Sequence, residues 1–201
     1  MTQWVTDFAD QAVILPALLA VGVMLCLGRR WSQAACWFAA IVPVLGVVGA
    51  LKSLAYACAW LWPLLDSDRL NVRSPSGHTA AAAVLYGSLA GLLAIRSPGV
   101  RAITLLAAAA IGVTIGLTRI ALATHSPVEV ALGLAAGLAG ALVFAFLLHR
   151  QHDRRIPTAA LVCALFVIAI QHGHHLGAEQ VIQDRFSLLL RTAIPACIPG
   201  P

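Results

Sequence analysis

Long apolar runs alternate with short polar segments along this chain. Each run comes close to the ~17–25 residues that a helix needs to cross the hydrocarbon core of a bilayer. Six such runs cover residues 11–28, 34–51, 79–95, 102–118, 127–148 and 156–171. The pattern therefore predicts an all-α polytopic membrane protein built as a bundle of six transmembrane helices.

Composition agrees with this class and excludes a soluble domain. The chain is 60% hydrophobic and 10% charged, and its mean hydropathy is +0.89. A soluble protein of this length carries far more charge. No polar stretch is long enough for a separate domain, so we expect one membrane-embedded domain over residues 1–201. Residues from about 177 onward have helical apolar spacing followed by prolines, which predicts an interfacial tail.

Arginine placement predicts the orientation, because positively charged loops stay on the cytoplasmic side. The connections after the first, third and fifth runs carry Arg29, Arg30, Arg96, Arg101, Arg150, Arg154 and Arg155. The opposite side spreads its basic residues over longer segments that also hold acidic residues. Both termini and the segment 52–78 are therefore expected outside, in a protein of a bacterial inner membrane. Since topology accounts for the basic pI, no nucleic-acid partner is inferred.

The five cysteines show no pattern of a metal or disulfide framework. They are Cys26, Cys36, Cys58, Cys163 and Cys197. None belongs to a CxxC pair, and three lie inside apolar runs. We expect them to behave as small hydrophobic residues.

Polar residues gather at the ends of the runs on the predicted outer side. Lys52 follows the second run, "PSGH" at 75–78 precedes the third, and Arg119 follows the fourth. His125 and Glu129 stand at the start of the fifth. Polar groups at membrane depth are costly and usually functional. One site between the helices is the prediction.

These residue types suit a phosphate group. A lysine and arginines in a low-dielectric pocket attract an anion, and Ser76 is placed to cap a helix whose first N–H groups face phosphate oxygens. Neutral imidazole can attack phosphorus, and a protonated imidazole can supply a leaving oxygen with its proton. Glu129 follows His125 by four residues on a helix, so it can hold one ring nitrogen. This chemistry requires no metal and no cofactor.

Two segments carry a resemblance to a known family. "PSGH" at 75–78 and "TRIALATHSPVE" at 118–129 resemble the motifs PSGH and SRxxxxxHxxxD of the type 2 phosphatidic acid phosphatase family. The resemblance implies metal-independent hydrolysis of a lipid phosphate monoester or pyrophosphate at the outer membrane boundary. His125 would form a phosphohistidine, Glu129 would orient it and His78 would be the general acid. The phosphoryl oxygens would be held by Lys52, Ser76, Gly77 and Arg119.

The sequence departs from the family motifs at three places. Thr118 and Glu129 replace the family's serine and aspartate and keep a hydroxyl and a carboxylate. The first family motif, KxxxxxxRP, is incomplete, because Lys52 is followed seven residues later by Ala59 and no Arg-Pro. Arg69 or Arg73 would then supply the missing cation. Arg73 is preferred because it lies two residues before Pro75.

Other functions stay open at this level. A lipid phosphotransferase would share the phosphohistidine, and a non-catalytic protein that binds or transports anionic lipids would use the same cations. The lipid substrate and the oligomeric state are not determined by these motifs. A metal site at the histidines His172, His174 and His175 is a further alternative, disfavoured because neighbouring side chains diverge.

Overall fold

The chain forms a bundle of helices that follows the apolar runs. The computed structural model describes residues 2–58, 74–153, 155–177, 180, 184–185 and 187–193. Within these residues the regular elements are helical, as predicted. They are α1 (Thr2–Thr6), η1 (Asp7–Ala9), α2 (Gln11–Leu27), α3 (Trp31–Ala57), α5 (Gly77–Leu93), α6 (Val100–Ala121), α7 (Pro127–His149), α8 (Thr158–Gln171) and α10 (Ser187–Ala193).

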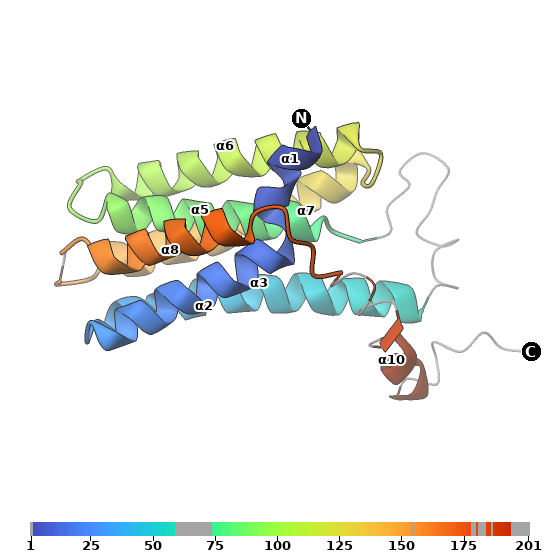
Figure 1. Cartoon of the computed structure of the whole chain (residues 1–201), viewed down its shortest axis with the longest axis horizontal. Coiled ribbons are helices and arrows are strands. Elements are labelled where there is room, and N and C mark those ends of the chain that lie inside the picture. Colours follow the sequence, from blue (N-terminus) through green and yellow to red (C-terminus); the bar gives the residue numbers. More distant parts are fainter. Residues whose placement is uncertain are drawn as a thin grey trace, which may run out of the picture.

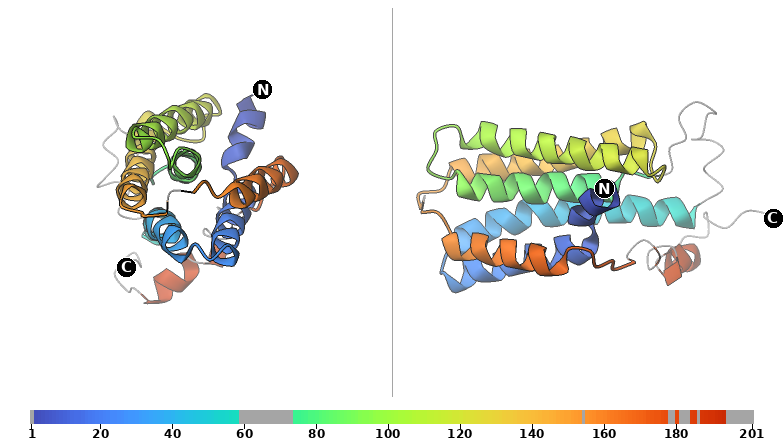
Figure 2. Two further views of the ribbon diagram at one scale, coloured as in Figure 1. Left: turned by 90° about the vertical axis from the view of Figure 1, so that its left-hand side faces the viewer. Right: turned by 45° about the horizontal axis from the view of Figure 1, so that its top comes forward.

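Helix α5 occupies the centre of the bundle (Figure 2), where it contacts α6, α7, α3, α2 and α8. Its residues Ala80–Ala83 are fully buried. A Cβ atom on Gly137 of α7 would lie 2.7 Å from the Ala80 carbonyl oxygen and 2.6 Å from the Ala83 Cβ. Small residues on both helices therefore permit the close approach that is common between membrane helices.

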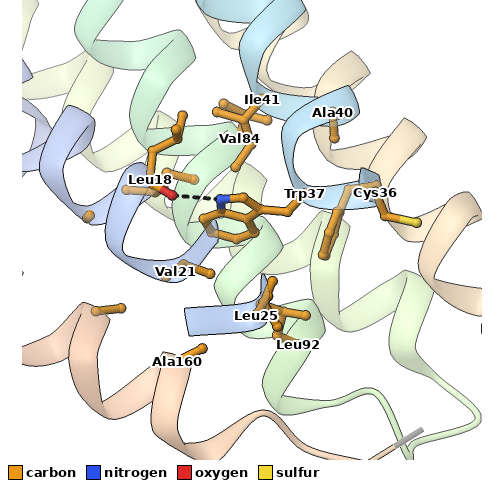
Figure 3. Packing of buried hydrophobic residues seen from close by; sticks show 14 of the residues in the cluster. Leu18, Val21, Leu25, Cys36, Trp37, Ala40, Ile41, Val84, Leu92 and Ala160 are labelled. Atoms are coloured by element: carbon orange, nitrogen blue, oxygen red, sulfur yellow. Dashed lines mark hydrogen bonds between the residues drawn. The ribbon is translucent and has the colours of Figure 1, made fainter. Parts of the chain in front are cut away.

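A second packing region joins α2, α3 and α5 around a buried indole (Figure 3). Trp37 is completely buried, and its Nε1–H donates a hydrogen bond of 3.0 Å to the Leu18 carbonyl oxygen. The ring packs edge to face on Phe144, with centroids 6.0 Å apart. A polar N–H that finds a partner lets this large side chain fill the core at little cost.

Four helical segments are long and apolar enough to cross a membrane. They are Thr2–Leu27, Trp31–Ala57, Val100–Ala121 and Pro127–His149. Helices α5 and α8 are apolar but have only 17 and 14 residues. At 1.5 Å per residue they fall short of the ~30 Å hydrocarbon core. The helices indicate an integral membrane protein, and the prediction of six membrane-length helices holds in the structure for four.

The two ends of the bundle differ in their connections (Figure 1). The loops α2–α3, α5–α6 and α7–α8 lie together at one end. There the Arg30 guanidinium donates to the Arg155 carbonyl oxygen and the Gln33 amide to that of Asp153. The start of α5 and the α6–α7 turn lie at the opposite end. The polar residues of the predicted site belong to this second end, called the site end below.

One prediction about the cysteines is wrong. Cys26, Cys36 and Cys163 are free thiols, as expected of small hydrophobic residues. Cys58, however, is disulfide-bonded. It follows the last residue of α3 at the site end, outside the apolar runs. Cys197 lies outside the described residues.

Candidate active site

A cavity of about 450 Å³ opens at the site end. It combines cationic, carboxylate, amide and apolar side chains from α1, η1, α2, α3, α5, α6 and the segment after α8. The residues that line it are Gln3, Thr6, Asp7, Asp10, Gln11, Leu15, Leu45, Val48, Gly49, Lys52, Gly77, His78, Arg119, His175 and Gly177.

The cations predicted for the site meet in this cavity. Lys52 comes from α3 and Arg119 from the last turn of α6, and both are buried at 5% and 9% exposure. Gly77 and His78, the first residues of α5, line the same space. The first N–H groups of a helix have no partner within the helix. Two buried positive charges and a helix N-terminus thus face one cavity, which is an electrostatic environment for a phosphate.

His125 and Glu129 form a close pair. The His125 Nδ1 lies 2.9 Å from the Glu129 Oε2, and their side chains are only 5% and 7% exposed. The structure corrects the reason given for this pairing, because α7 begins at Pro127 and His125 precedes the helix. Ser126 is the N-cap, and a capping box links its backbone N–H to the Glu129 Oε2 at 3.0 Å. The carboxylate thus binds helix cap and histidine together.

Glu129 also connects α7 to the turn before α5 by hydrogen bonds. The Ser74 N–H donates to the Glu129 Oε1 at 2.9 Å, and the Ser76 N–H donates to the Glu129 carbonyl oxygen at 2.9 Å. Gly133, one turn further along α7, permits this contact, since a Cβ atom there would collide with the Ser76 carbonyl oxygen. The segments "PSGH" and "TRIALATHSPVE" are therefore joined by the Glu129 carboxylate and by the close approach of Gly133 to Ser76.

Ser76 does not cap α5 with its side chain, although the sequence predicts that it does, and its role in binding phosphate stays a prediction. It is the N-cap residue of α5, but its side chain makes no capping hydrogen bond. Its Oγ accepts a hydrogen bond of 3.0 Å from the Thr79 hydroxyl, and the residue is completely buried. Ser76 is not among the described residues that line the cavity. Its hydroxyl stabilises the turn that presents Gly77 and His78.

The α6–α7 turn brings His125 back toward the bundle. Ala123 adopts a left-handed conformation with φ 52°. The Ala123 N–H donates to the Ile120 carbonyl oxygen at 2.9 Å and the Thr124 N–H to that of Arg119 at 3.1 Å. These are the two bonds of a Schellman motif, which ends a helix with a sharp reversal. The left-handed alanine costs about 1–2 kcal/mol, offset by the satisfied carbonyls.

The environment keeps His125 neutral. Burial lowers the pKa of the His125 imidazole, and the positive charges of Lys52 and Arg119 lower it further, whereas the Glu129 carboxylate opposes the shift. His125 is not among the described residues that line the cavity. Lys52 and Arg119, which do line it, act electrostatically on both His125 and His78. A neutral ring is the form that can attack phosphorus.

Three further residues line the cavity: two were not predicted for the site, and His175 was considered only as a metal ligand. They are Asp7, Asp10 and His175, which share the cavity with the cations. The Asp10 Oδ2 lies 3.9 Å from the His78 Nε2 and 3.3 Å from the His175 Nδ1. The His175 Nε2 lies 3.8 Å from the Asp7 Oδ1. One signal was present: Asp10 directly precedes an apolar run on the side of "PSGH".

The remaining predicted residues fall into two groups. Arg73 and Arg69 lie outside the described residues. Of the histidines near 172–175, His172 contacts the Trp4 carbonyl oxygen at 3.0 Å and the Phe8 ring, with centroids 4.1 Å apart. Among the described residues no group of three or more His, Cys, Asp or Glu side chains has the arrangement of a metal site.

Comparison with known proteins agrees with the motifs. The model of the PAP2 superfamily matches residues 57–157. The chain belongs to the PAP2 superfamily. The matched residues include His78, Arg119, His125 and Glu129 but begin after Lys52. Since PAP2 members are phosphatases and related phosphoesterases, membership supports phosphoric ester hydrolysis in general.

One relative is similar over most of the chain. It is the "Uncharacterized 22.5 kDa protein in cps region" of Klebsiella pneumoniae, 29% identical over 152 residues, which cover 75% of this chain and 71% of that protein. No solved structure matches the chain.

Proposed function

We propose that this PAP2 protein hydrolyses a lipid phosphate monoester or pyrophosphate at the outer face of the membrane, through a phosphohistidine on His125. The observation that carries the proposal is the 2.9 Å contact between the His125 Nδ1 and the Glu129 Oε2, beside a cavity lined by Lys52 and Arg119. With Nδ1 held by a carboxylate, Nε2 is the nitrogen left for attack.

In the first half of the reaction, the Nε2 of neutral His125 attacks phosphorus. An N–P bond forms while the bond from phosphorus to the leaving oxygen breaks. Protonated His78 gives its proton to the leaving oxygen. Lys52, Arg119 and the N–H groups at the start of α5 stabilise the charge on the phosphoryl oxygens. Glu129 stabilises the charge that His125 acquires.

In the second half, water attacks the phosphohistidine. Neutral His78 accepts a proton from that water, the N–P bond breaks, and phosphate leaves with His125 neutral again. The nucleophile and the proton donor are side chains of this chain, so the scheme assigns no step to a metal. Arg73 is proposed as a further cation for the phosphate on the sequence argument alone.

The apolar part of the cavity supports a lipid as the substrate. Leu45, Val48, Gly49 and Lys52 follow one face of α3 at helical spacing and all line the cavity, with Leu15 of α2 also lining it. The cavity thus passes from hydrocarbon side chains to buried charge. A phosphate ester with an aliphatic tail matches a cavity that is apolar on one part and charged on the other.

Orientation toward the exterior is part of the proposal, with six membrane helices, one domain and an interfacial tail. Two observations support it. The described arginine-rich loops lie at the end opposite the cavity, as the positive-inside rule requires for the cytoplasmic side. Cys58 is disulfide-bonded at the site end, and disulfides persist in oxidising compartments such as the periplasm. The relative from Klebsiella pneumoniae is a bacterial protein, which is compatible with the proposed bacterial origin.

The test is phosphate release by the purified protein in detergent with EDTA present. The substrates are phosphatidic acid, phosphatidylglycerol phosphate, lipid A phosphate and undecaprenyl pyrophosphate, and His125→Ala is the blank. We expect release from at least one lipid and its loss in the variant. Full activity of His125→Ala would contradict the proposal. Phosphate transfer to an added lipid or sugar acceptor would show a phosphotransferase, and headgroup binding without turnover would show a binding or transport protein.

A further inference from the structure

Asp10 is fixed in place by the start of α2. It is the N-cap residue, and its Oδ1 accepts hydrogen bonds from the Ala12 N–H at 2.8 Å and from the Leu176 N–H at 3.3 Å. The first bond is the ordinary N-cap interaction. The second joins Asp10 to the segment after α8. With Oδ1 engaged by two backbone donors, Oδ2 has a defined direction.

Oδ2 lies near two histidines, His175 and His78. The Asp10 Oδ2 lies 3.9 Å from the His78 Nε2, and the two side chains are 16% and 17% exposed. In the described part of the chain, Asp10 provides the carboxylate within 4 Å of this ring. Since 3.9 Å is longer than a hydrogen bond, the His78 Nε2–H does not donate a hydrogen bond to Asp10. A leaving oxygen that enters the cavity can still receive its proton.

The other charges around His78 are mostly positive. Lys52 from α3 and Arg119 from α6 act on it electrostatically, and both are buried. On the carboxylate side, His175 lies 3.3 Å from the Asp10 Oδ2 and bridges to Asp7. A protonated His78 is therefore repelled by two cations in a low-dielectric site. Only a nearby negative charge can offset that repulsion.

We infer that Asp10 is a positioning residue of the proposed reaction, which favours the protonated form of His78 and orients its ring toward the cavity so that it can supply the leaving oxygen with a proton. Asp10 itself takes no proton. When His78 donates, the proton passes to the leaving oxygen, and the neutral ring regains one from the water that hydrolyses the phosphohistidine. The inference rests on the proposed function and adds a residue outside the motifs that carry the family resemblance.

The test compares Asp10→Asn with wild type on two substrates that differ in leaving group. Asparagine is as good an N-cap as aspartate, so α2 keeps its start while the charge is lost. With a lipid alkyl phosphate we expect a kcat about tenfold or more lower, little change in KM, and a basic limb of the pH–rate profile at lower pH. With an aryl phosphate such as 4-nitrophenyl phosphate, whose leaving group needs no proton, the rate should stay near wild type.

The matched control is Asp7→Asn, which removes a carboxylate from the same side of the cavity. Asp7 contacts Gln3 and His175, so its variant should keep the wild-type pH profile. Equal losses of Asp10→Asn on both substrates, or a profile like that of Asp7→Asn, would overturn the inference and leave the proposed function intact. Wild-type protein that hydrolyses neither substrate would contradict the proposed function instead.

A second measurement does not depend on activity. In protein with isotope-labelled histidine, the NMR titration of His78 should have its midpoint at lower pH in Asp10→Asn than in wild type. The midpoint should be unchanged in Asp7→Asn. A His78 titration that is the same in all three proteins would exclude the role of Asp10.

Discussion

Two sides of the site end are built in different ways. The α5–α7 side, residues 74–79 and 125–133, is held by hydrogen bonds of 2.9–3.3 Å that centre on Glu129. The N-terminal side, residues 3–11 with His175, faces the cavity through contacts of 3.3–3.9 Å between ionisable groups. The first side fixes the proposed nucleophile tightly. The second leaves room beside the proposed general acid, as a site that admits a leaving group requires.

The largest expected effect comes from removing the charge at the centre of the α5–α7 side. Glu129→Gln should lower kcat about 10²- to 10⁴-fold, because an amide cannot stabilise the positive charge that His125 acquires. The matched variant Glu129→Asp keeps the charge and should lose less. Steady-state phosphate release measures both. Equal activities of Glu129→Gln and wild type would show that the Glu129 hydrogen bonds of the α5–α7 side do not serve the reaction.

A smaller but still large effect should follow from separating α5 and α7. A Cβ atom on Gly133 would collide with the Ser76 carbonyl oxygen, so Gly133→Ala should displace the paired motifs. A misplacement of about 1 Å can cost about 100-fold in rate.

The control is Gly140→Ala on the same helix. There a Cβ atom would lie 2.5 Å from the Val44 Cγ2 and 3.0 Å from the Ala40 carbonyl oxygen, two turns further from the site. Both variants should melt at a lower temperature than wild type, and only Gly133→Ala should lose kcat. Loss of kcat in both would show general destabilisation.

The apolar side of the cavity predicts a selective effect. Gly49 lines the cavity, and a Cβ atom there meets no atom within 4 Å. Gly49→Phe should therefore fold but occupy the space for an aliphatic tail. We expect activity on long-chain phosphatidic acid to fall about tenfold or more, with activity on a short-chain, water-soluble phosphate kept.

Gly46→Phe provides the matched control for Gly49→Phe. Gly46 lies one turn earlier on α3, also has open space at its Cβ position, and does not line the cavity. This variant should behave like wild type on both substrates. If the two variants have the same effect, the tail does not lie along this face of α3.

The smallest effect is a shift of the pH profile. Because burial and the cations lower the pKa of His125 below its ordinary value, which is about 6.5, kcat/KM should start to fall only below that pH. Lys52→Gln should move the acidic limb to higher pH, since it removes a positive charge. Glu129→Gln should move it to lower pH. Shifts of the opposite sign would contradict the assignment of this limb to His125.

The same shift predicts a stability trend. His125 has a lowered pKa in the folded protein, so the unfolded chain binds more protons as the pH falls through about 6.5. Folding stability should therefore decrease on the acidic side and recover above that pH. Thermal unfolding in detergent between pH 5 and pH 8 measures this trend.

Much of the fold was predictable because a chain segment in a bilayer must be apolar and must satisfy its backbone hydrogen bonds internally, as a helix does. The third and sixth runs, 79–95 and 156–171, differ by two residues or fewer at each end from α5 and α8. The second run, 34–51, stops before Lys52, where the hydropathy falls. Lys52 is buried in the bundle, however, and α3 continues to Ala57. Burial of a charged residue depends on its neighbours in space, which hydropathy does not report.

The site was predictable where its contacts are local. His125 and Glu129 are four residues apart, and their contact follows from the sequence around them. Asp10 and His175 are 165 residues apart, and neither belongs to a motif. Only the packing of α2 and α8 beside α5 brings them into the cavity that His78 lines. Long-range contacts between single residues leave no periodic signal in one sequence.

In the proposed reaction, His125 carries the phosphoryl group between the two half-reactions. The most direct measurement is to quench the protein at alkaline pH during turnover of a lipid phosphate and to locate covalent phosphate by mass spectrometry. We expect phosphate on His125, with the base-stable, acid-labile behaviour of a phosphohistidine, and none in His125→Ala. Turnover by wild-type protein with phosphate trapped on another residue, or retained turnover in His125→Ala, would contradict this role of His125.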